Sequence, residues 1–433
     1  MTLQFHLKHL FLLIVLSICL SSCSILKITQ SSIGTAWSNN SVNTVIFRNK
    51  AITSSKNYQF TAYYNNDGKV VIARRKLPSG PWETNTTQYS GNVKDAHNSI
   101  SIIIDNDGYL HISWDHHDTK LRYAKSTTPF GLELTQELSM TGEQEERVTY
   151  PEFHNLPNGN LLFCYRSGKS GRGNMVINTY DSKQKTWKQL QNNLLNGEEQ
   201  RSAYWQMTVG NNGSLYLSWV WRESWDVSTN HDICFAKSED GGITWTKSNN
   251  EKYALPITAA TAEVAWKIPQ NSSLINQTSM VTDKNGNPYI ATYWETNGVP
   301  QYKVVYLENG NWKLKESTFN TSAFHLGGGG TKSIPLSRPK IFVNGKNIYL
   351  LYRNSADGGR VMLANTAIDT EEWETRALTE QSVGQWEPNY DEELWQNEKQ
   401  LHIFSQNVVQ VDGEGLSETE PQPVNIIEVK HIR

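Results

Sequence analysis

Short runs of alternating apolar and polar residues recur along the whole chain after residue 30, and Asn-Gly or Asp-Gly pairs interrupt them. A period of two is typical of half-buried β-strands, and such pairs favour tight hairpin turns. No segment after residue 30 shows sustained apolar residues at helical spacing, so the pattern predicts antiparallel hairpins without helices. The six pairs are Asp67-Gly68, Asp107-Gly108, Asn158-Gly159, Asn212-Gly213, Asn285-Gly286 and Asn344-Gly345.

The hairpins repeat at intervals of about 40 to 73 residues, which is the length of one small sheet per repeat. A seventh candidate spans residues 397–404, where Glu398 and Lys399 replace the glycine turn. Seven repeats over residues 23–433 give about 59 residues each, and repeats of that length without helices are typical of propeller blades. We therefore expect an all-β fold, a seven-bladed β-propeller that forms a single domain over residues 23–433. An array of β-sandwiches is the alternative.

One eight-residue stretch, residues 238–245, supports the propeller. It matches the Asp-box pattern S-x-D-x-G-x-T-W and so resembles sialidase-like propellers. In that motif the aspartate satisfies turn amides and the tryptophan packs between strands. We expect Asp240 and Trp245 to be structural and to take no part in chemistry.

The amino-acid composition argues against nucleic-acid binding. The 433 residues include 40 Lys and Arg against 43 Asp and Glu, a formal net charge of −3, so no basic field favours nucleic acid. The 15 Trp, 19 Tyr and 29 Gly suit strands and turns.

The first residues predict export. An apolar run over residues 10–20 follows Lys8 and His9 and is too short to span a bilayer, which indicates a signal peptide over residues 1–22. The sequence Leu-Ser-Ser-Cys that ends at Cys23 resembles a bacterial lipobox, so we expect an exported lipoprotein lipidated at Cys23. Such a protein would sit in the cell envelope, at the outer-membrane surface or in the periplasm, and touch the membrane only through its anchor. An ordinary cleaved signal peptide is the alternative.

Propellers bind ligands at the mouth of the central channel, so polar clusters at strand ends are candidates for chemistry. The first cluster joins His97-Asn98 to the run Trp114-Asp115-His116-His117. Alternation along a strand would place His111, Ser113, Asp115 and His117 on one face and His116 on the other. Several histidines so close together favour a functional site over a single structural histidine.

Two further clusters follow. Tyr150 precedes a proline, and Arg166 ends a strand that runs into the glycine-rich loop of residues 167–174. Arginine is rarely buried unpaired, so Arg166 is either functional or part of a surface salt bridge. The third cluster holds Tyr204 and a tryptophan-rich segment over residues 219–225, which suits stacking on sugar rings or packing between blades.

Histidine, tyrosine and arginine together suit β-elimination at a uronate, which removes the proton on C5 and expels the oxygen on C4. Arg166 would neutralise the carboxylate and stabilise the enolate-like charge that develops. His97 and Tyr150 would supply the base and the acid, in either order. A tyrosine base needs neighbouring positive charge, because its ordinary pKa is near ~10.

Residues 60–250, with these motifs and the Asp box, resemble the BNR-repeat propellers that include the ulvan lyases. The resemblance implies a lyase acting on ulvan, an acidic sulfated polymer of rhamnose and uronate, and leaving a 4,5-unsaturated uronate end. We also expect a monomer and no catalytic cofactor. The catalytic residues it implies are His97, Tyr150, Arg166, Tyr204 and His117, and the substrate-binding candidates are Asn98, His116, Arg222 and Trp221.

The same resemblance implies a structural zinc ion held by His and Cys. His231 and Cys234 lie three residues apart, and His325 precedes a run of four glycines, so these three are the candidate ligands. A free thiol with surface histidines is the alternative. Cys164 and Cys234 are the only cysteines after residue 23, and they could also pair or stay buried as thiols.

Two other functions remain open at this point. A sialidase-like glycoside hydrolase would need an arginine triad and paired carboxylates, for which Asp115, Glu152 and Glu387 are available. A lipid-anchored propeller could also bind glycans without catalysis.

Overall fold

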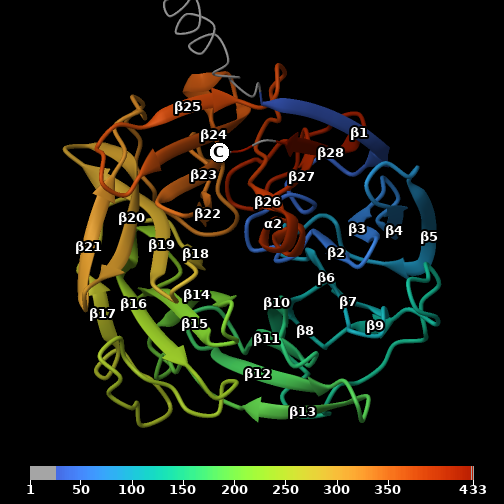
Figure 1. The fold of residues 1–433 in the computed structure, drawn as a ribbon, viewed down its shortest axis with the longest axis horizontal. Coiled ribbons are helices and arrows are strands. Elements are labelled where there is room, and N and C mark those ends of the chain that lie inside the picture. The colour runs from blue at the N-terminus through green and yellow to red at the C-terminus, as the bar shows by residue number, and fades with distance from the viewer. Residues whose placement is uncertain (1–25, 431, 433) are drawn as a thin grey trace, which may run out of the picture.

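The computed structural model describes residues 26–430 and 432. The predicted signal peptide and Cys23 lie outside the described residues. Seven antiparallel sheets form a ring, so the predicted seven-bladed β-propeller is confirmed (Figure 1). Blade one holds β2 (Ile52–Ser55), β3 (Tyr58–Tyr64), β4 (Lys69–Lys76) and β5 (Glu83–Ser90); blade two holds β6 (Ile100–Ile104), β7 (Leu110–Trp114) and β9 (Tyr123–Lys125).

The next blades follow in chain order. Blade three holds β10 (Val148–Asn155), β11 (Leu161–Ser167), β12 (Asn174–Asp181) and β13 (Thr186–Gln191), with the short β8 (His117–Thr119) paired to β10. Blade four holds β14 (Ser202–Val209), β15 (Leu215–Arg222), β16 (Asn230–Ser238) and β17 (Glu263–Trp266), and the 3-10 helix η1 (Val227–Thr229) precedes β16. Blade five holds β18 (Ser279–Thr282), β19 (Pro288–Thr296), β20 (Val299–Glu308) and β21 (Asn311–Glu316).

The last two blades close the ring. Blade six holds β22 (Lys340–Asn344), β23 (Asn347–Asn354), β24 (Arg360–Ala367) and β25 (Glu374–Ala377), with the 3-10 helix η2 (Ser355–Asp357). Blade seven joins β26 (Asn389–Tyr390), β27 (Leu401–Gln406) and β28 (Gln422–Lys430) to β1 (Lys27–Ala36) from the other end of the chain. Because β1 pairs with β28 from Lys27↔Lys430 to Ala36↔Gln422, strand hydrogen bonds close the propeller.

The Asn-Gly and Asp-Gly pairs make turns between adjacent strands, as predicted. Asp67-Gly68 connects β3 to β4, and the other five pairs connect the first strand of a blade to the second. In blade two, Asp105 Oδ1 accepts hydrogen bonds from the backbone N–H groups of Asp107 and Tyr109 at 3.0 and 2.8 Å. Gly108 has φ of 93°, a conformation that glycine adopts without strain. The first strands lie innermost, where they contact one another from blade to blade.

The sequence predicted a hairpin without helices at residues 397–404, and this prediction is wrong for the first half of that segment. A seven-residue helix, α2 (Glu392–Glu398), lies near the centre of the ring and packs on β2 and β27, which starts at Leu401 (Figure 1). The carboxylate of Asp391 caps it by accepting from Leu394 N at 3.0 Å. Two helical turns are too short to show periodicity in the sequence. Within the described residues, no helix has the length and apolarity needed to cross a bilayer.

The Asp box is structural, as predicted. Asp240 accepts hydrogen bonds from Ile243 N at 3.1 Å, from Thr244 N at 2.9 Å and from Thr244 Oγ1 at 2.6 Å. Trp245 is buried and its indole N–H donates to Gly242 O at 3.1 Å. The motif therefore holds the turn after β16 against the core.

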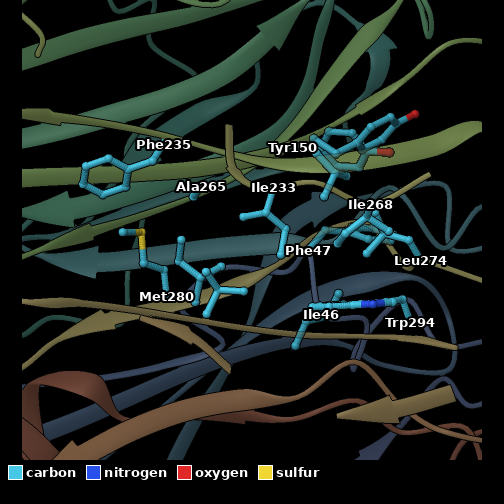
Figure 2. Packing of buried hydrophobic residues seen from close by; sticks show 14 of the residues in the cluster. Ile46, Phe47, Tyr150, Ile233, Phe235, Ala265, Ile268, Leu274, Met280 and Trp294 are labelled. Carbon is cyan, nitrogen blue, oxygen red and sulfur yellow. The ribbon is translucent and has the colours of Figure 1, made fainter. Parts of the chain in front are cut away.

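The apolar core extends directly under one mouth of the channel. One cluster of buried residues, drawn in Figure 2, includes Ile46, Phe47, Tyr150, Ile233 and Ile268. Tyr204 belongs to the same cluster. Aromatic residues that could meet a ligand at this mouth are therefore backed by rigid packing.

We predict that Asp240→Ala lowers the free energy of unfolding by about 1–2 kcal/mol, because it leaves turn amides without their acceptor. Chemical denaturation of the purified protein measures the change. Glu239→Ala is the matched control: Glu239 is exposed and pairs only with Lys237, so its loss should change stability by less than about 0.5 kcal/mol. Equal effects of the two substitutions would contradict the role of Asp240.

Candidate active site

A cavity of about 280 Å³ opens among the blades, and all five predicted catalytic residues line it. Asn155, at the far end of β10, lines a different hollow beside α2, so the cavity and the helix lie at opposite ends of the inner strands. The side chains that line the cavity include Phe47, His97, His117, Tyr150, Arg166, Ser170, Tyr204, Arg222, Trp225, Lys332, Arg338 and Glu414.

An irregular strand positions three of these residues. Thr149 of β10 pairs with Arg166 on one side and with His117 on the other, so both side chains come next to Tyr150. The register of β10 then shifts before Glu152, and Tyr150 itself has φ of 58°. A bulky residue rarely adopts a positive φ, and such strain is concentrated at functional sites. The bulge therefore aims Tyr150 into the cavity.

A hydrogen-bonded cluster of two imidazoles and two carboxylates forms one wall. The rings of His97 and His117 stack with centroids 4.1 Å apart. Asp95 bridges them, because its Oδ1 lies 2.9 Å from His97 Nδ1 and its Oδ2 lies 2.6 Å from His117 Nδ1. Glu414 Oε1 lies 3.0 Å from the same Nδ1 of His97. Both histidines thus bind the carboxylates through Nδ1, and Nε2 is left for a ligand.

The two carboxylates control the charge of His97. Burial would lower the pKa of His97, but hydrogen bonds to Asp95 and Glu414 outweigh it and raise the pKa to about 9. Burial acts to raise the pKa of Asp95, but its hydrogen bonds with His117 and His97 outweigh it and hold that pKa well below its ordinary value. His97 is therefore an imidazolium at neutral pH, since its raised pKa keeps the proton until the pH rises through about 9.

Two tyrosines and two arginines also line the cavity. The guanidinium of Arg166 lies 5.0 Å from the ring centroid of Tyr150, and that of Arg222 lies 5.4 Å from the ring centroid of Tyr204. Burial and the adjacent Tyr204 raise the pKa of Tyr150 despite the guanidiniums. Burial also acts to raise the pKa of Tyr204, but Arg222 and Arg166 outweigh it and lower that pKa. The pKa values of the two phenols, whose ring centroids lie 6.1 Å apart, are thus shifted in opposite directions.

Several predicted residues lie elsewhere. The strand alternation proposed for His111 and His117 is wrong, because β7 ends at Trp114 and Asp115 has φ of 70°, which sends His111 into the core and His117 to the cavity. His116 is fully buried, where burial lowers its pKa to about 3, and its Nε2 lies 3.0 Å from the hydroxyl of Ser113. His116 therefore cannot contact a substrate.

Asn98 and Trp221 also lie outside the cavity. Asn98 is buried, donates to Asn92 O at 2.9 Å and borders a neighbouring depression with His117. Trp221 packs edge-on against Trp219 in the core, since both alternate inward from β15. The tryptophan that lines the cavity is Trp225, whose surface is 69% exposed.

Four residues that line or support the cavity were not predicted from the sequence. Asp95 lies two residues before His97, and this short spacing could have identified it as a partner of the histidine. Phe47, Arg338 and Glu414 come from segments far from the motifs, and no local pattern marks them. Their contacts exist only because the ring brings distant blades together.

The predicted zinc ligands do not fit a metal ion. His231 uses Nε2 on Glu223 at 2.8 Å and Nδ1 on Asp232 at 3.1 Å. The Cys234 thiol is buried in an apolar cluster that raises its pKa, whereas zinc needs a thiolate. Cys164 and Cys234 are both free thiols. His325 is exposed and pairs with Glu295.

Among the described residues, one group of three potential metal ligands lies within 4.8 Å, namely Asp95, His97 and His117. The hydrogen bonds within this group already use the Nδ1 atoms and the carboxylate, and the imidazolium state of His97 opposes a metal ion. We therefore assign the group to proton and charge control.

The carboxylates proposed for a hydrolase are not arranged as a pair. Glu387 is buried and bonded to Arg338 at 2.6 Å, and Asp115 is bonded to Arg122 at 2.7 Å. Glu152 is buried beside His154. None of the three lines the cavity, so the two facing carboxyl groups of a glycoside hydrolase are missing from the described part of this site.

A propeller with this site belongs to a known family. Residues 58–319 match the family model described as BNR repeat-containing family member, and the chain belongs to that family. Curated relatives include ulvan lyases, long isoform, from Glaciecola sp. (strain KUL10) and Alteromonas sp., each 24% identical, over 32% and 48% of this chain. The matches cover only 18% and 27% of those relatives.

Solved structures share the fold over nearly the whole chain. The polysaccharide lyase Uly1 superposes with a TM-score of 0.71 at 16% identity, covering 93% of this chain and 98% of that one. An ulvan lyase of family PL25 bound to -[GlcA(1-4)Rha3S]- gives a TM-score of 0.65 at 15% identity, covering 87% and 93%. These similarities establish the architecture.

We predict that Glu414→Gln lowers the pKa of His97 by about one unit, because one of two charged acceptors is lost. Histidine resonances in an NMR titration measure it. Glu418→Gln, an exposed position on the same segment, is the control and should leave the titration unchanged. An unaltered midpoint in Glu414→Gln would show that Asp95 alone sets the charge of His97.

Proposed function

We propose that this protein is a polysaccharide lyase of the ulvan lyase type. It cleaves a sulfated rhamnose and uronate polymer by β-elimination at the uronate and leaves a 4,5-unsaturated uronate end. The observation that carries the proposal is Arg166, a buried guanidinium that faces the cavity beside Tyr150 and has no hydrogen-bond or ion-pair partner among the described residues.

Two other buried arginines, Arg48 and Arg353, have hydrogen-bond partners within the protein, unlike Arg166. Arg48 donates to backbone carbonyls at Asn43 and Ile100, at 2.5 and 2.9 Å. Arg353 donates to the carbonyls of Ile334 and Pro335 at 2.8 and 2.9 Å. These two arginines are thus satisfied internally, since an uncompensated buried charge costs several kcal/mol, roughly 3–5 in measured cases. The guanidinium of Arg166 is therefore available for an anionic ligand. Its planar pair of N–H donors fits the two oxygens of a uronate carboxylate.

The directions of the pKa shifts then suggest which residue acts as the base and which as the acid. Tyr204, whose pKa is lowered, is the base that takes the C5 proton, while Arg166 and the imidazolium of His97 stabilise negative charge on the carboxylate. The electron pair forms the C4–C5 double bond and the C4–O4 bond breaks. Tyr150, whose raised pKa keeps it protonated, gives its proton to the leaving oxygen. Solvent exchange returns both phenols to their starting states.

The comparisons support this choice over hydrolysis or simple binding. The curated relatives carry the name ulvan lyase, and a solved relative of the same fold binds a uronate-containing oligosaccharide. A hydrolase of the usual kind needs two facing carboxyl groups, whereas Glu414, the carboxylate that lines this cavity, is committed to His97 and Thr331.

We predict that Arg166→Lys lowers kcat/KM on ulvan by about 10²-fold or more, because an ammonium cannot hold a carboxylate in the same bidentate geometry. The measurement is the ultraviolet absorbance of the conjugated double bond formed during polymer cleavage. Arg172→Lys, at an exposed position of the neighbouring glycine-rich loop, is the control and should behave as wild type. Wild-type protein that leaves ulvan intact, or yields saturated ends, would refute the lyase assignment.

We also propose that the protein is exported and anchored by lipid at Cys23 in the cell envelope, as a monomer. The signal-like run and the lipobox-like Leu-Ser-Ser-Cys sequence support this proposal. Expression in a bacterium fed with labelled fatty acid should label the wild type and leave Cys23→Ser unlabelled, with the fatty acid detected by mass spectrometry. Equal labelling of the two proteins would contradict the anchor.

A further inference from the structure

Two hollows flank α2, the helix near the centre of the ring (Figure 1). One has a volume of about 420 Å³ and the other a volume of about 500 Å³. Thr208, Val209, Asn211 and Gln396 line both hollows, which therefore form one continuous depression beside the helix. We call this depression the α2 groove. The proposed elimination uses none of the residues that line it.

The α2 groove and the active-site cavity lie at opposite ends of the inner strands. Tyr150 of β10 lines the cavity, whereas Asn155 of the same strand lines the groove. Tyr204 and Thr208 of β14 are divided in the same way. Five residues of extended strand span roughly 16 Å. A short ligand in the cavity therefore cannot fill the groove, but a long chain that passes around the edge of the ring can reach both.

The carboxylates that line the α2 groove all have partners inside the protein. Glu392 and Glu393 bind Lys50 Nζ at 3.2 and 2.5 Å. Asp105 and Asp283 accept hydrogen bonds from backbone N–H groups of their own turns at 2.8 to 3.0 Å. These four are the acidic residues of the groove in the described part of the chain, so it presents no uncommitted negative charge.

Three lysines of the groove have no such partner. Lys56, Lys284 and Lys399 are exposed, and none has a carboxylate within ion-pair distance among residues 26–430. Lys346, by contrast, is paired with Asp369 at 2.7 Å. Lys56 lines the smaller hollow, and the other two free lysines line the larger one. The uncommitted charge of the groove is therefore positive in both hollows, which favours an anionic ligand.

The uncharged groups of the groove suit a sugar chain. Side-chain amides carry both donors and acceptors, so they can pair with sugar hydroxyls. The exposed amides of the groove are Asn106, Asn211, Asn285, Gln396 and Asn397. Tyr289 lines the larger hollow, is half-buried and is fixed by stacking on Tyr306, with ring centroids 5.8 Å apart. An aromatic side chain held in this way offers apolar surface to a sugar ring.

We propose that the α2 groove is a second binding site for an acidic polysaccharide, and that it holds the polymer without cleaving it. The free ammonium groups bind the anionic groups of the chain, and the amides and Tyr289 bind its hydroxyls and ring surfaces. The identity of the polymer rests on the proposed function. A chain held at a second point has a raised effective concentration at the cavity, so the groove favours long polymers over short products.

The test removes two of the free charges. In a Tyr204→Phe background, which prevents cleavage during the measurement, Lys284→Ala with Lys399→Ala should raise the Kd for ulvan by about two- to thirtyfold, the range for two exposed ion pairs. Affinity electrophoresis in gels that contain ulvan measures the Kd. Lys183→Ala with Lys188→Ala removes the same charge from exposed positions at the outer edge of blade three and should leave the Kd unchanged.

A kinetic experiment varies the length of the substrate. With Tyr204 intact, Lys284→Ala with Lys399→Ala should lower kcat/KM on polymeric ulvan and leave it unchanged on an ulvan tetrasaccharide, which is too short to reach both faces. Thermal unfolding should match that of the wild type, because both lysines are exposed. An unchanged Kd for the polymer, or equal losses of kcat/KM on the two substrates, would overturn the proposed groove.

The same measurements separate this proposal from the lyase assignment. Wild-type protein that binds ulvan through Lys284 and Lys399 but does not cleave it would retain the groove and refute the lyase. Cleavage of ulvan with a Kd that the two lysines do not affect would do the reverse. Vesicles that contain anionic phospholipid test the other anionic surface. Lysine-dependent binding of these vesicles, with unchanged binding of ulvan, would assign the groove to a membrane and overturn the proposal.

Discussion

The antiparallel pairing of β1 with β28 is the constraint on which the rest of the molecule depends, because it closes the ring between the two ends of the chain. The closed ring brings the loop between β27 and β28, which holds Glu414, next to the segment before β6, which holds His97. Glu414 can then accept a hydrogen bond from His97, and Thr331 N donates to the same carboxylate at 2.6 Å. In an open arc of blades these segments would separate, and His97 would lose one of its two charged partners.

Once the ring is closed, local environment decides the state of each ionisable group. Carboxylates keep His97 protonated, burial keeps Tyr150 protonated, and two guanidiniums favour the phenolate of Tyr204. Groups whose environments push their pKa values apart are typical of sites that move protons. Neither Arg166 nor Arg222 has a carboxylate partner among the described residues, a destabilising arrangement that an anionic polymer would relieve.

Much of the fold followed from the sequence, and the errors have physical causes. The Asn-Gly and Asp-Gly turns depend on local backbone preferences, so the hairpins and their number could be predicted from the sequence. The helix α2 was missed because two turns show no clear period, and its cap at Asp391 looks like any loop aspartate. The face assignment around His117 failed because a single left-handed residue, Asp115, ends the alternation on which it relied.

The sequence by itself determined the strand period, the turns, and the chemical identity of His97, Tyr150, Arg166 and Tyr204, since all of these are properties of short segments. Only the tertiary structure decided which residues meet around the cavity. It selected Trp225 over Trp221 as the exposed indole, brought in Glu414 and separated the proposed zinc ligands. Such contacts depend on how blades far apart in the chain pack against one another, and local periodicity carries no information about that packing.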